Sequence, residues 1–472
     1  MQQRGERKEF HMSFMQSRFE DVEFAKTKFP ERFSYGLGDV ACNVVFALTT
    51  SLLIYFYTNV AGVSAALVGS IMAISRIFDG ISDVLIGTLV DRTHSKHGKS
   101  RAWILWMMIP YGISAILLFC VPPASTMVKA IYIFVTYNFC TTVVYTALNL
   151  PYATLATLMT RDTDDRAIIN LFRTGMSALG NMIITAVTFP LVTMLGDTQM
   201  AWIEVSVFYA IISIVMLFIC FRNCHERVHI QTQSKSGGDL PLLTGLKLVI
   251  TNKYFIMFFM LALFLALYEA VTGACNAYYA QYVLGNRDFL GALGSFESMP
   301  QIITVLVLAP FILKLGKRNV ALIGSAVAVI GMITMLFAPT NLYIALFGCV
   351  MRGIGKGCFR GVKYSMLADV IEYGYWKTGT RVQGLIVSAT TAGQKFGSGV
   401  TVAVVGWLLD AAGFVGEDVI PASASTMITN IYIWGNILAW GLIGVTLIFY
   451  KLDKIYPQIM QDLKEREAAK AK

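Results

Sequence analysis

The sequence has little charge for its length. Only 14% of the 472 residues are Asp, Glu, Lys or Arg, and 56% are hydrophobic, against about 25% and about 45–50% in soluble domains. This excludes an ordinary soluble domain and predicts an all-α protein that crosses a lipid bilayer many times. The net charge of +9 is accounted for by Lys and Arg in cytoplasmic loops and within the apolar segments, so we expect no nucleic-acid partner.

Histidine and paired cysteine are also scarce. The eight Cys lie mostly inside apolar runs without metal-ligand spacing, so we expect them to act as small hydrophobic residues. The five His all lie in the expected tail or loops, at His11, His94, His97, His225 and His229. Without an intramembrane His, a metal cluster or a nucleophile–base motif, we expect neither enzyme activity nor a resident cofactor.

Twelve apolar segments are long enough to cross a bilayer as helices, at ~1.5 Å per residue against ~30 Å of hydrocarbon. They cover approximately 34–58, 65–90, 102–121, 128–157, 169–195, 201–221, 253–283, 289–313, 319–338, 341–368, 383–410 and 426–451. Lys and Arg concentrate in alternate loops, and the positive-inside rule then places both termini in the cytoplasm. The first 33 residues lack the apolar core of a cleavable signal peptide. We expect a multi-pass protein of the inner (plasma) membrane.

The chain divides into two halves of six segments. We expect a cytoplasmic tail (1–33), a first bundle (34–221), a cytoplasmic linker (222–252), a second bundle (253–451) and a second cytoplasmic tail (452–472). A weak repeat supports this division, because His97-Gly98-Lys99-Ser100 follows the second segment and Leu315-Gly316-Lys317-Arg318 follows the eighth. Twelve helices in two such bundles resemble the major facilitator plan, in which substrate binds between the halves near the midplane.

Two carboxylates stand out in segment 65–90. Asp79 and Asp83 are four residues apart, which places them on one helix face, and the only other charge in the segment is Arg76. A charge at membrane depth costs at least ~2.5–3.5 kcal/mol on insertion scales. A metal ion or a proton is the simplest way to neutralise the pair, so the spacing predicts a site for a coupling cation. The alternative is a structural ion pair with Arg76.

Several stretches resemble the glycoside–pentoside–hexuronide:cation symporter family. They are Ser34-Tyr35-Gly36-Leu37-Gly38-Asp39, Tyr55-Phe56-Tyr57-Thr58, Arg76-Ile77-Phe78-Asp79-Gly80-Ile81-Ser82-Asp83, Asp91-Arg92-Thr93 with Gly98-Lys99, Asn149-Leu150-Pro151-Tyr152, Ala368-Asp369-Val370-Ile371-Glu372-Tyr373-Gly374, and Lys377-Thr378-Gly379 with Arg381. They extend from about residue 34 to residue 400. The resemblance implies the major facilitator fold and cation-driven uptake of a sugar or glycoside by a monomer in a lipid bilayer.

The resemblance also assigns cation ligands. Asp79 and Asp83 match the acids that bind the cation on the second helix, and Thr146 on the fourth helix matches a neutral ligand. Ser82 stands where sodium-coupled carriers of the melibiose type have Asn. A hydroxyl still ligates a hard cation, so the monovalent coupling ion, Na⁺ or H⁺, is left open.

The sugar-binding positions depart from the melibiose-type pattern. The acids that hold galactosides there are replaced by Asn43 and Asn149, which is closer to the glucuronide-carrier branch of the family. Arg173 and Lys395 match positions that line the sugar cavity, with charge balance against the second helix as the alternative. Tyr145 is the best candidate for stacking on a sugar ring, although core packing is the more common role of such an aromatic residue.

Segment 341–368 carries four cations at spacings of 4, 4 and 3. These residues, Arg352, Lys356, Arg360 and Lys363, fall within ~80° of arc and form a single basic stripe. Among the charges that we place inside the membrane, away from the span ends, seven cations face five acids. The cations are Arg76, Arg173, Lys395 and the stripe, and the acids are Asp39, Asp79, Asp83, Glu269 and Glu297.

An uncompensated positive cavity is costly when empty and favourable around an anion. We therefore expect an anionic sugar, such as a glucuronide or another hexuronide, with a sulfonated sugar or a neutral glycoside as alternatives. In the competing interpretation Glu269 and Glu297 neutralise two of the stripe cations, while Arg352 and Lys363 lie at wetter levels. A lysolipid carrier is a remote alternative, because the charged, Asn-bearing cavity argues against an apolar groove.

Charged residues also follow the second and tenth helices. We expect Asp91 with Arg92, and Asp369 with Glu372 against Lys377 with Arg381, to form cytoplasmic ion pairs. Such pairs would stabilise the outward-open state and break when the carrier opens inward.

Overall fold

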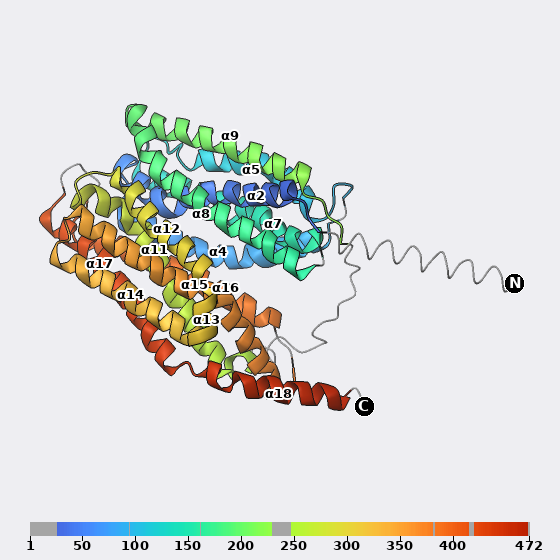
Figure 1. Ribbon diagram of the computed structural model, residues 1–472. Helices are drawn as coiled ribbons and strands as arrows, with labels where there is room; N and C mark the ends of the chain where they lie inside the picture. The colour runs from blue at the N-terminus through green and yellow to red at the C-terminus, as the bar shows by residue number, and fades with distance from the viewer. Residues whose placement is uncertain are drawn as a thin grey trace.

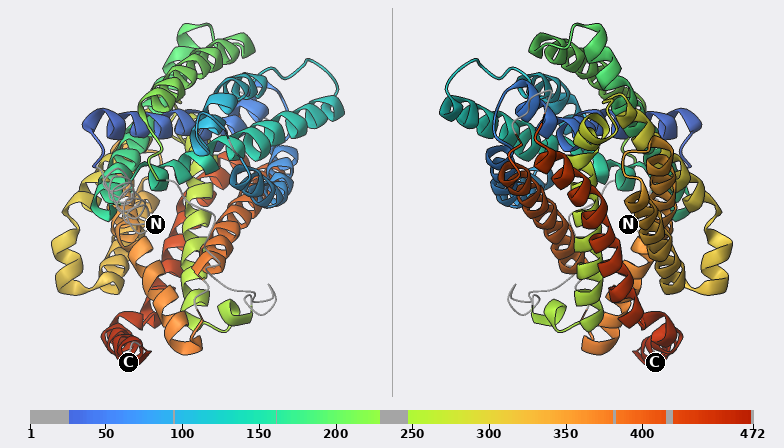
Figure 2. Two further views of the ribbon diagram at one scale, coloured as in Figure 1. Left: turned by 90° about the vertical axis from the view of Figure 1, so that its right-hand side faces the viewer. Right: turned by 90° about the vertical axis from the view of Figure 1, so that its left-hand side faces the viewer.

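The computed structural model describes residues 26–93, 95–160, 162–228, 247–380, 383–414 and 420–470, and the side chains of a few further residues within these ranges, among them Asp91, are not described. Throughout this described part the chain is helical and contains no strand. Figure 1 shows two groups of helices, with the blue-to-green first half above the yellow-to-red second half. The perpendicular views in Figure 2 show the same division.

The first half contains six membrane-length helical segments. In the first and the fourth segment, short π-helical stretches follow the α-helices without a break, so each of these two segments forms one extended rod. The segments are α2 (Phe29–Ala47) with η1 (Leu48–Leu52), α3 (Leu53–Tyr55) and η2 (Phe56–Val60); α4 (Ala65–Asp91); α5 (Ser100–Leu117); α6 (Thr126–Tyr137) with η3 (Asn138–Tyr145) and α7 (Thr146–Met159); α8 (Thr163–Met194); and α9 (Gln199–Asn223).

The second half repeats this plan and ends in an additional helix. Its elements are α11 (Lys253–Tyr278) with η4 (Tyr279–Val283); α12 (Phe289–Val307) with the short α13 (Ala309–Leu315); α14 (Lys317–Phe337); α15 (Leu342–Thr378); α16 (Gln383–Ala411); α17 (Ala422–Phe449); and α18 (Leu452–Lys470). The stretch expected to be a tail from residue 452 is therefore helical from Leu452 to Lys470.

Eleven helical segments of the described chain are long and apolar enough to cross a membrane. The remaining predicted segment, 383–410, corresponds to α16, a helix of 29 residues. It is long enough to span at ~1.5 Å per residue, but Gln394, Lys395 and several Gly, Ser and Thr residues lower its apolar character. Lys395 is one of the predicted site residues, so the predicted segment that is not among the eleven apolar spans is one expected to carry function.

The two halves meet along three pairs of helices. α4 lies against α16, α8 lies against α12, and the first rod lies against α11 at η1. The side chain of Trp407 in α16 donates a hydrogen bond to Ser70 Oγ in α4, at 2.9 Å. These contacts place the second and eleventh predicted spans side by side, which is a proximity that the order of the segments does not indicate.

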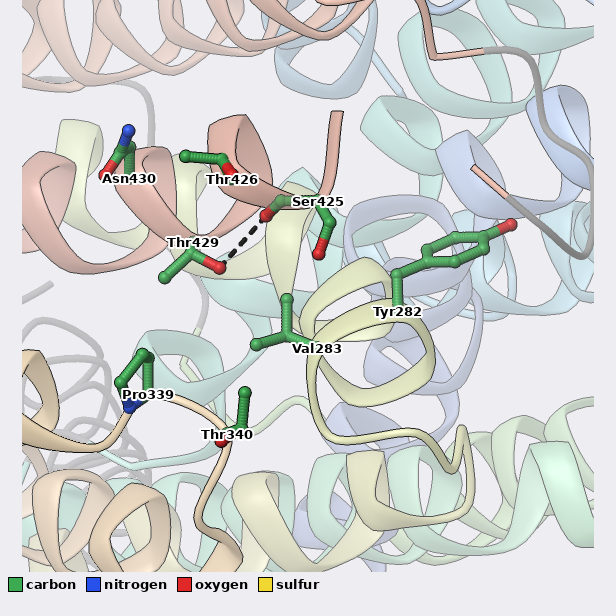
Figure 3. A pocket seen from close by; sticks show the side chains of 8 residues that line it. All are labelled: Tyr282, Val283, Pro339, Thr340, Ser425, Thr426, Thr429 and Asn430. Carbon is green, nitrogen blue, oxygen red and sulfur yellow. Dashed lines mark hydrogen bonds between the residues drawn. The ribbon is translucent and has the colours of Figure 1, made fainter. Parts of the chain in front are cut away.

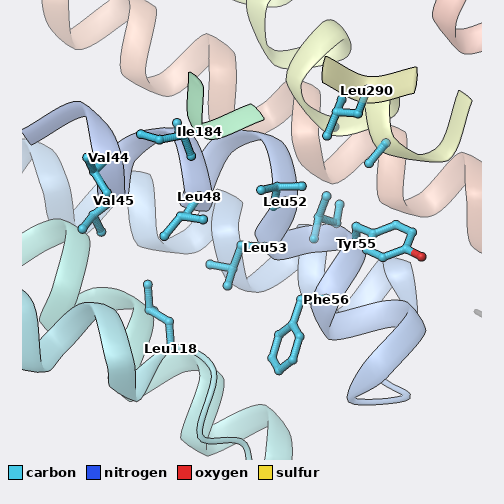
Figure 4. Packing of buried hydrophobic residues seen from close by; sticks show 14 of the residues in the cluster. Val44, Val45, Leu48, Leu52, Leu53, Tyr55, Phe56, Leu118, Ile184 and Leu290 are labelled. Carbon is cyan, nitrogen blue, oxygen red and sulfur yellow. The ribbon is translucent and has the colours of Figure 1, made fainter. Parts of the chain in front are cut away.

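A continuous apolar core joins the halves near η1. Leu48, Leu52 and Phe56 of the first rod are buried with Ile184 of α8 and Leu290 of α12. Figure 4 shows these side chains converging from segments that are far apart in the sequence. Apolar side chains of both bundles thus pack around the first rod in this conformation.

The weak sequence repeat corresponds to a repeated structure. In the first half, Gly98 has φ +95°, a backbone conformation that favours glycine. The carboxylate of Glu226, which follows α9, accepts hydrogen bonds from the backbone N–H groups of Lys99, Ser100 and Arg101 at 2.8–2.9 Å. The guanidinium of Arg101 donates to the carbonyl of Phe221 near the end of α9, at 2.7 Å.

The second half contains the corresponding contacts. Gly316 has φ +80°, and the carboxylate of Asp453, after α17, accepts a hydrogen bond from the backbone N–H of Arg318 at 2.8 Å. The guanidinium of Arg318 donates to the carbonyls of Leu447 and Ile448 at 2.7 Å. In each half, an Arg thus satisfies carbonyl groups at the end of the last bundle helix.

Candidate functional site

The two carboxylates of α4 have separate basic partners. Asp79 is buried, with 3% exposure, and its Oδ2 lies 3.0 Å from Nη1 of Arg76. Asp83 instead contacts the ammonium of Lys395, which comes from α16 in the other half. The alternative predicted for Asp79, an ion pair with Arg76, is therefore present, and the partner of Asp83 is a residue that sequence spacing did not indicate.

A threonine that the sequence did not single out contacts the first carboxylate. Thr142 Oγ1 in η3 donates a hydrogen bond to Asp79 Oδ1 at 2.5 Å, and the Thr142 carbonyl accepts one from Ser82 Oγ at 2.5 Å. The predicted ligand Thr146 is buried one helical turn later, and no hydrogen bond joins it to either carboxylate in the described chain. The spacing of four residues between Thr142 and Thr146 was the available signal.

The predicted sugar-side residues of the first half gather around Asp39 in α2. Asn43 Nδ2 donates to Asp39 Oδ2 at 3.0 Å, and Arg173 Nε in α8 donates to Asp39 Oδ1 at 2.8 Å. The Arg173 guanidinium also lies 5.3 Å from the centre of the Tyr152 ring. Arg173 therefore balances charge on the first helix, whereas Lys395 does so on the second.

Tyr145 and Asn149 differ in how they are held. The Tyr145 ring stacks on that of Phe46, with 5.9 Å between ring centres, so packing, the alternative role, is its role in this conformation. Asn149 is half-buried, and within the described residues its side chain has no hydrogen-bond partner. Asn149 is thus the predicted sugar contact whose amide is free in this conformation.

Glycines recur every four residues beside the basic stripe of α15. Each of its first three cations is followed by a glycine, at Gly353, Gly357 and Gly361. A Cβ atom at Gly353 would lie 2.2 Å from the Glu297 carbonyl oxygen, and one at Gly357 would lie 2.8 Å from the Gln301 carbonyl oxygen. The glycines let α12 approach the α15 backbone closely, which brings the stripe cations within reach of acids on α11 and α12.

Glu297 of α12 pairs with two stripe cations. Its Oε2 lies 3.0 Å from Nη2 of Arg352, and its Oε1 lies 3.0 Å from Nζ of Lys356. The Tyr268 hydroxyl also donates to Oε1 at 2.7 Å. Arg352 is fully buried, so the expectation that it lies at a wetter level is wrong. The glycine pattern explains this, since it seals α12 over that part of α15.

The half of the stripe toward the C-terminal end of α15 is more open. Arg360 is exposed and pairs with Glu269 of α11. Lys363 is half-buried, has no carboxylate within ion-pair distance among the described residues, and lies 5.7 Å above the ring of its neighbour Tyr364. Glu269 and Glu297 therefore do neutralise stripe cations, as the competing interpretation held.

The pairing shows where the positive charge is in excess. Asp39, Asp79 and Asp83 each have their own cation outside the stripe. The four stripe cations share only Glu269 and Glu297. Within the described spans, the surplus of two positive charges therefore belongs to one face of α15, next to the helices that contact the first half.

The predicted cytoplasmic ion pairs differ from those in the structure. Asp369 contacts Lys317 of its own half at 2.6 Å, because the Gly-Lys turn before α14 lies beside α15. Lys377 instead donates to the Thr251 carbonyl at 3.3 Å. Glu372 is half-buried and Arg92 is exposed. The Asp91 side chain and Arg381 lie outside the described residues, and a role for these residues in gating stays a prediction.

The opposite end of the molecule, where η2 and η4 lie, is closed by contacts between the halves. Thr58 and Tyr278 share a hydrogen bond between their hydroxyls at 2.8 Å. Arg287, in the loop before α12, contacts Asp197, in the loop after α8, at 2.6 Å. Burial acts to lower the pKa of Arg287, but its bonds to Asp197 outweigh this and raise the pKa, so the side chain stays charged.

A cavity of about 340 Å³ lies at this end of the second half. It is lined by Tyr282, Val283, Pro339, Thr340, Ser425, Thr426, Thr429 and Asn430. Figure 3 shows hydroxyl and amide groups of α17 around it. None of these lining residues is charged, and none is a predicted site residue. The cavity is therefore separate from the charged cluster on α11, α12 and α15.

The arrangement of the helices defines a class of transport protein. A crystal structure of a D-xylose–proton symporter superposes with a TM-score of 0.66 over 88% of this chain and 97% of that one, at 12% identity. At that identity the likeness shows the fold alone, and the fold is that of the major facilitator transporters. The expected major facilitator fold is therefore confirmed.

The chain belongs to the MFS/sugar transport protein family, whose match covers residues 34–454. It is 34% identical over 447 residues to the isoprimeverose transporter of Lactiplantibacillus pentosus, covering 93% of this chain and 92% of that one. It is 28% identical over 450 residues to the glucuronide carrier protein homolog of Escherichia coli, covering 92% and 95% of the two chains. The resemblance to glycoside–pentoside–hexuronide:cation symporters is thereby confirmed.

Proposed function

We propose that this protein is a secondary active symporter that imports an anionic sugar, a glucuronide or another hexuronide, together with a cation. The observation that carries the proposal is the surplus of two positive charges on α15, where four cations face two carboxylates. A cationic surface at membrane depth is unfavourable when empty and favourable around an anion. The similarity to a glucuronide carrier homolog supports the same substrate class.

The substrate-binding residues would come from both halves. Asn43, Tyr145, Asn149 and Arg173 are the proposed sugar contacts from the first half, and Lys356, Arg360, Lys363 and Lys395 those from the second. A guanidinium group binds a carboxylate or a sulfonate through two parallel hydrogen bonds, and an ammonium group binds it as a point charge. A sugar with one acidic group would then place that group at the stripe and its hydroxyls at the asparagines.

The coupling cation would bind at α4. Asp79, Asp83, Ser82 and Thr146 are the proposed ligands, with Na⁺ or H⁺ as the ion. Since Lys395 contacts Asp83 in this conformation, the ammonium has to move away before a metal ion binds there. A proton on Asp83 would equally end that ion pair. No resident cofactor is proposed.

Alternating access would connect the two sites. The contacts between α4 and α16 and between α8 and α12 support rocking of the halves against each other. The closed end of the molecule, where η2 and η4 lie, corresponds to one end of that motion. We further propose that the carrier is a monomer in the inner membrane with both termini in the cytoplasm, as the distribution of Lys and Arg indicates.

A neutral glycoside is the second candidate substrate. It is favoured by the similarity to a transporter named for isoprimeverose and by the pairing of three stripe cations with Glu269 and Glu297. In this case the stripe would stabilise the fold of the second half, and the sugar would be held by the asparagines and aromatic rings.

The test is uptake of a matched pair of sugars into proteoliposomes that contain the full chain. Phenyl β-D-glucuronide and phenyl β-D-glucoside differ only in the carboxylate at C6. We expect uptake of the glucuronide to exceed that of the glucoside and to depend on a Na⁺ or pH gradient. Measurements with and without Na⁺ at two pH values identify the ion. Equal uptake of both sugars, unchanged in Lys356→Gln, would overturn the anionic-substrate proposal.

A further inference from the structure

Glu297 is bound by two cations that differ in freedom of movement. Arg352 is fully buried, and its guanidinium lies 5.0 Å from the centre of the Tyr432 ring and 6.0 Å from that of Tyr268. Its Nη2 also donates to the Tyr432 hydroxyl at 2.9 Å. Arg352 is thus fixed by its surroundings. Lys356 has 16% of its side chain exposed and a flexible four-carbon stem.

Because Glu297 pairs with two cations, one of them can move away without leaving the carboxylate unpaired. Breaking a buried ion pair is costly when a charge is left unpaired. If Lys356 turns away from Glu297, the carboxylate keeps Arg352 at 3.0 Å and the Tyr268 hydroxyl at 2.7 Å. Arg360 differs in this respect, because it is the ion-pair partner of Glu269, and its departure would leave Glu269 without that contact.

We propose that Glu297 competes with the anionic group of the substrate for Lys356. In the empty carrier Glu297 pairs with Lys356, and an anionic sugar takes the place of Glu297 at the Lys356 ammonium. This inference rests on the proposed function and deepens it. The exchange replaces one negative partner of Lys356 by another, so an uncharged sugar gains nothing from it. Glu297 therefore lowers the affinity for every sugar acid while keeping the empty site from holding an unpaired ammonium.

Lys363 completes the anion site. It has no carboxylate within ion-pair distance in the described chain, and it interacts electrostatically with Glu269, as do Lys356 and Arg360. The anionic group of the sugar would lie between Lys356 and Lys363, on the side of α15 that faces α11. Arg352 has a positioning role, since it holds Glu297 in place and does not itself reach the sugar.

A double-mutant cycle tests the competition. Binding of phenyl β-D-glucuronide and of phenyl β-D-glucoside is measured by titration calorimetry on the purified full chain with Glu297→Gln, Lys356→Gln and the combination. We expect Glu297→Gln to bind the glucuronide at least roughly tenfold more tightly, and Lys356→Gln at least roughly tenfold more weakly, as for a close charge pair. In the Lys356→Gln background, Glu297→Gln should change the glucuronide affinity by less than about twofold, because Glu297 then has no ammonium for which it competes with the sugar.

The control is the glucoside, whose affinity should stay within about twofold of the wild-type value in each variant. A Glu297→Gln effect that persists without Lys356, or that is the same for both sugars, would overturn the proposal, because a structural role would act that way. Should Glu297→Gln fail to fold, Glu297→Asp keeps the charge beside Arg352 but shortens the reach to Lys356. It should then bind the glucuronide more tightly than the wild-type protein does, and no change in Glu297→Asp would count against the competition.

The failure of this inference is distinguishable from the failure of the proposed function. If the wild-type protein binds the glucuronide no better than the glucoside and Lys356→Gln changes neither, the anionic-substrate proposal itself fails. If the wild-type protein prefers the glucuronide but the cycle is additive, Lys356 binds the anion without competition from Glu297, and only the inference is lost.

Discussion

Arg287 and Asp197 form a two-bond ion pair that joins the halves at the end where η2 and η4 lie. Nη1 donates to Oδ1 at 2.8 Å, and Nη2 lies 2.6 Å from Oδ2. Nη2 also donates to Thr193 Oγ1 at 2.7 Å. Bidentate Arg–carboxylate pairs are among the stronger polar contacts in proteins. Together with the Thr58–Tyr278 bond, this pair holds the carrier closed on that side.

Asp197→Asn should increase the time that the carrier spends open to the outside. Loss of the charge removes an ion pair worth up to roughly 1 kcal/mol at the surface, so the open population should rise about two- to fivefold. The measurement is the labelling rate of a single Cys introduced at Thr58, which is buried in this conformation, by a membrane-impermeant maleimide in a background without the native Cys.

The matched control for this experiment is Asp288→Asn, because Asp288 is an exposed acid next to Arg287 in the sequence. Its labelling rate should equal that of the parent. Equal rates in the Asp197 and Asp288 variants would show that the ion pair does not hold the outer end closed.

Asp83→Asn should uncouple transport from the cation gradient. The neutral amide removes the charge that is proposed to bind the cation and that Lys395 contacts in this conformation. We expect accumulation against a gradient to be lost while exchange of internal for external sugar persists, because exchange does not need net cation flux. Concentrative uptake and counterflow in proteoliposomes measure the two activities, with Asp410→Asn on the exposed side of α16 as the control. Full cation-stimulated accumulation in the Asp83 variant would refute the assignment.

Thr142→Val should weaken the site at α4. It keeps the side-chain shape but removes the donor to Asp79 Oδ1, and a hydrogen bond to a charged group is worth roughly 1.5–3 kcal/mol. We expect a lower thermal midpoint and an altered half-saturating concentration of the coupling cation. Thr141→Val is the matched control, because Thr141 Oγ1 donates to the Tyr137 carbonyl and, within the described chain, has no hydrogen bond to Asp79. Identical behaviour of the two variants would remove Thr142 from the site.

Gly353→Ala should separate α12 from α15. The added Cβ would lie 2.2 Å from the Glu297 carbonyl oxygen, and overpacking of this kind costs roughly 1–3 kcal/mol. The thermal midpoint of the purified protein should fall, and glucuronide binding should weaken because Glu297 and Lys356 move apart. Gly441→Ala in α17 has open space around its Cβ and serves as the control. A Gly353→Ala protein as stable as the Gly441→Ala protein would contradict the close packing.

Much of the fold could be predicted because it depends on local properties of the chain. Span lengths follow from apolar runs, and the two halves follow from the repeat around Gly98 and Gly316, whose turns proved to be equivalent. α16, which is not among the eleven apolar spans, was still found from its length and its flanking breaks. In this conformation Asp369 pairs with Lys317, which is 52 residues away, and not with the nearby Lys377, because sequence proximity says little about which helix ends are neighbours.

The sequence by itself determined which charges enter the membrane, that cations outnumber acids there, and to which family the chain belongs. Only the tertiary structure decided which acid each cation meets. Lys395 lies 312 residues from Asp83 and reaches it because α16 packs along α4. The surplus remains on α15 because its glycines admit α12 and only one carboxylate with it. Helix periodicity specifies the face on which a charge lies, but the partner across that face depends on how the helices pack.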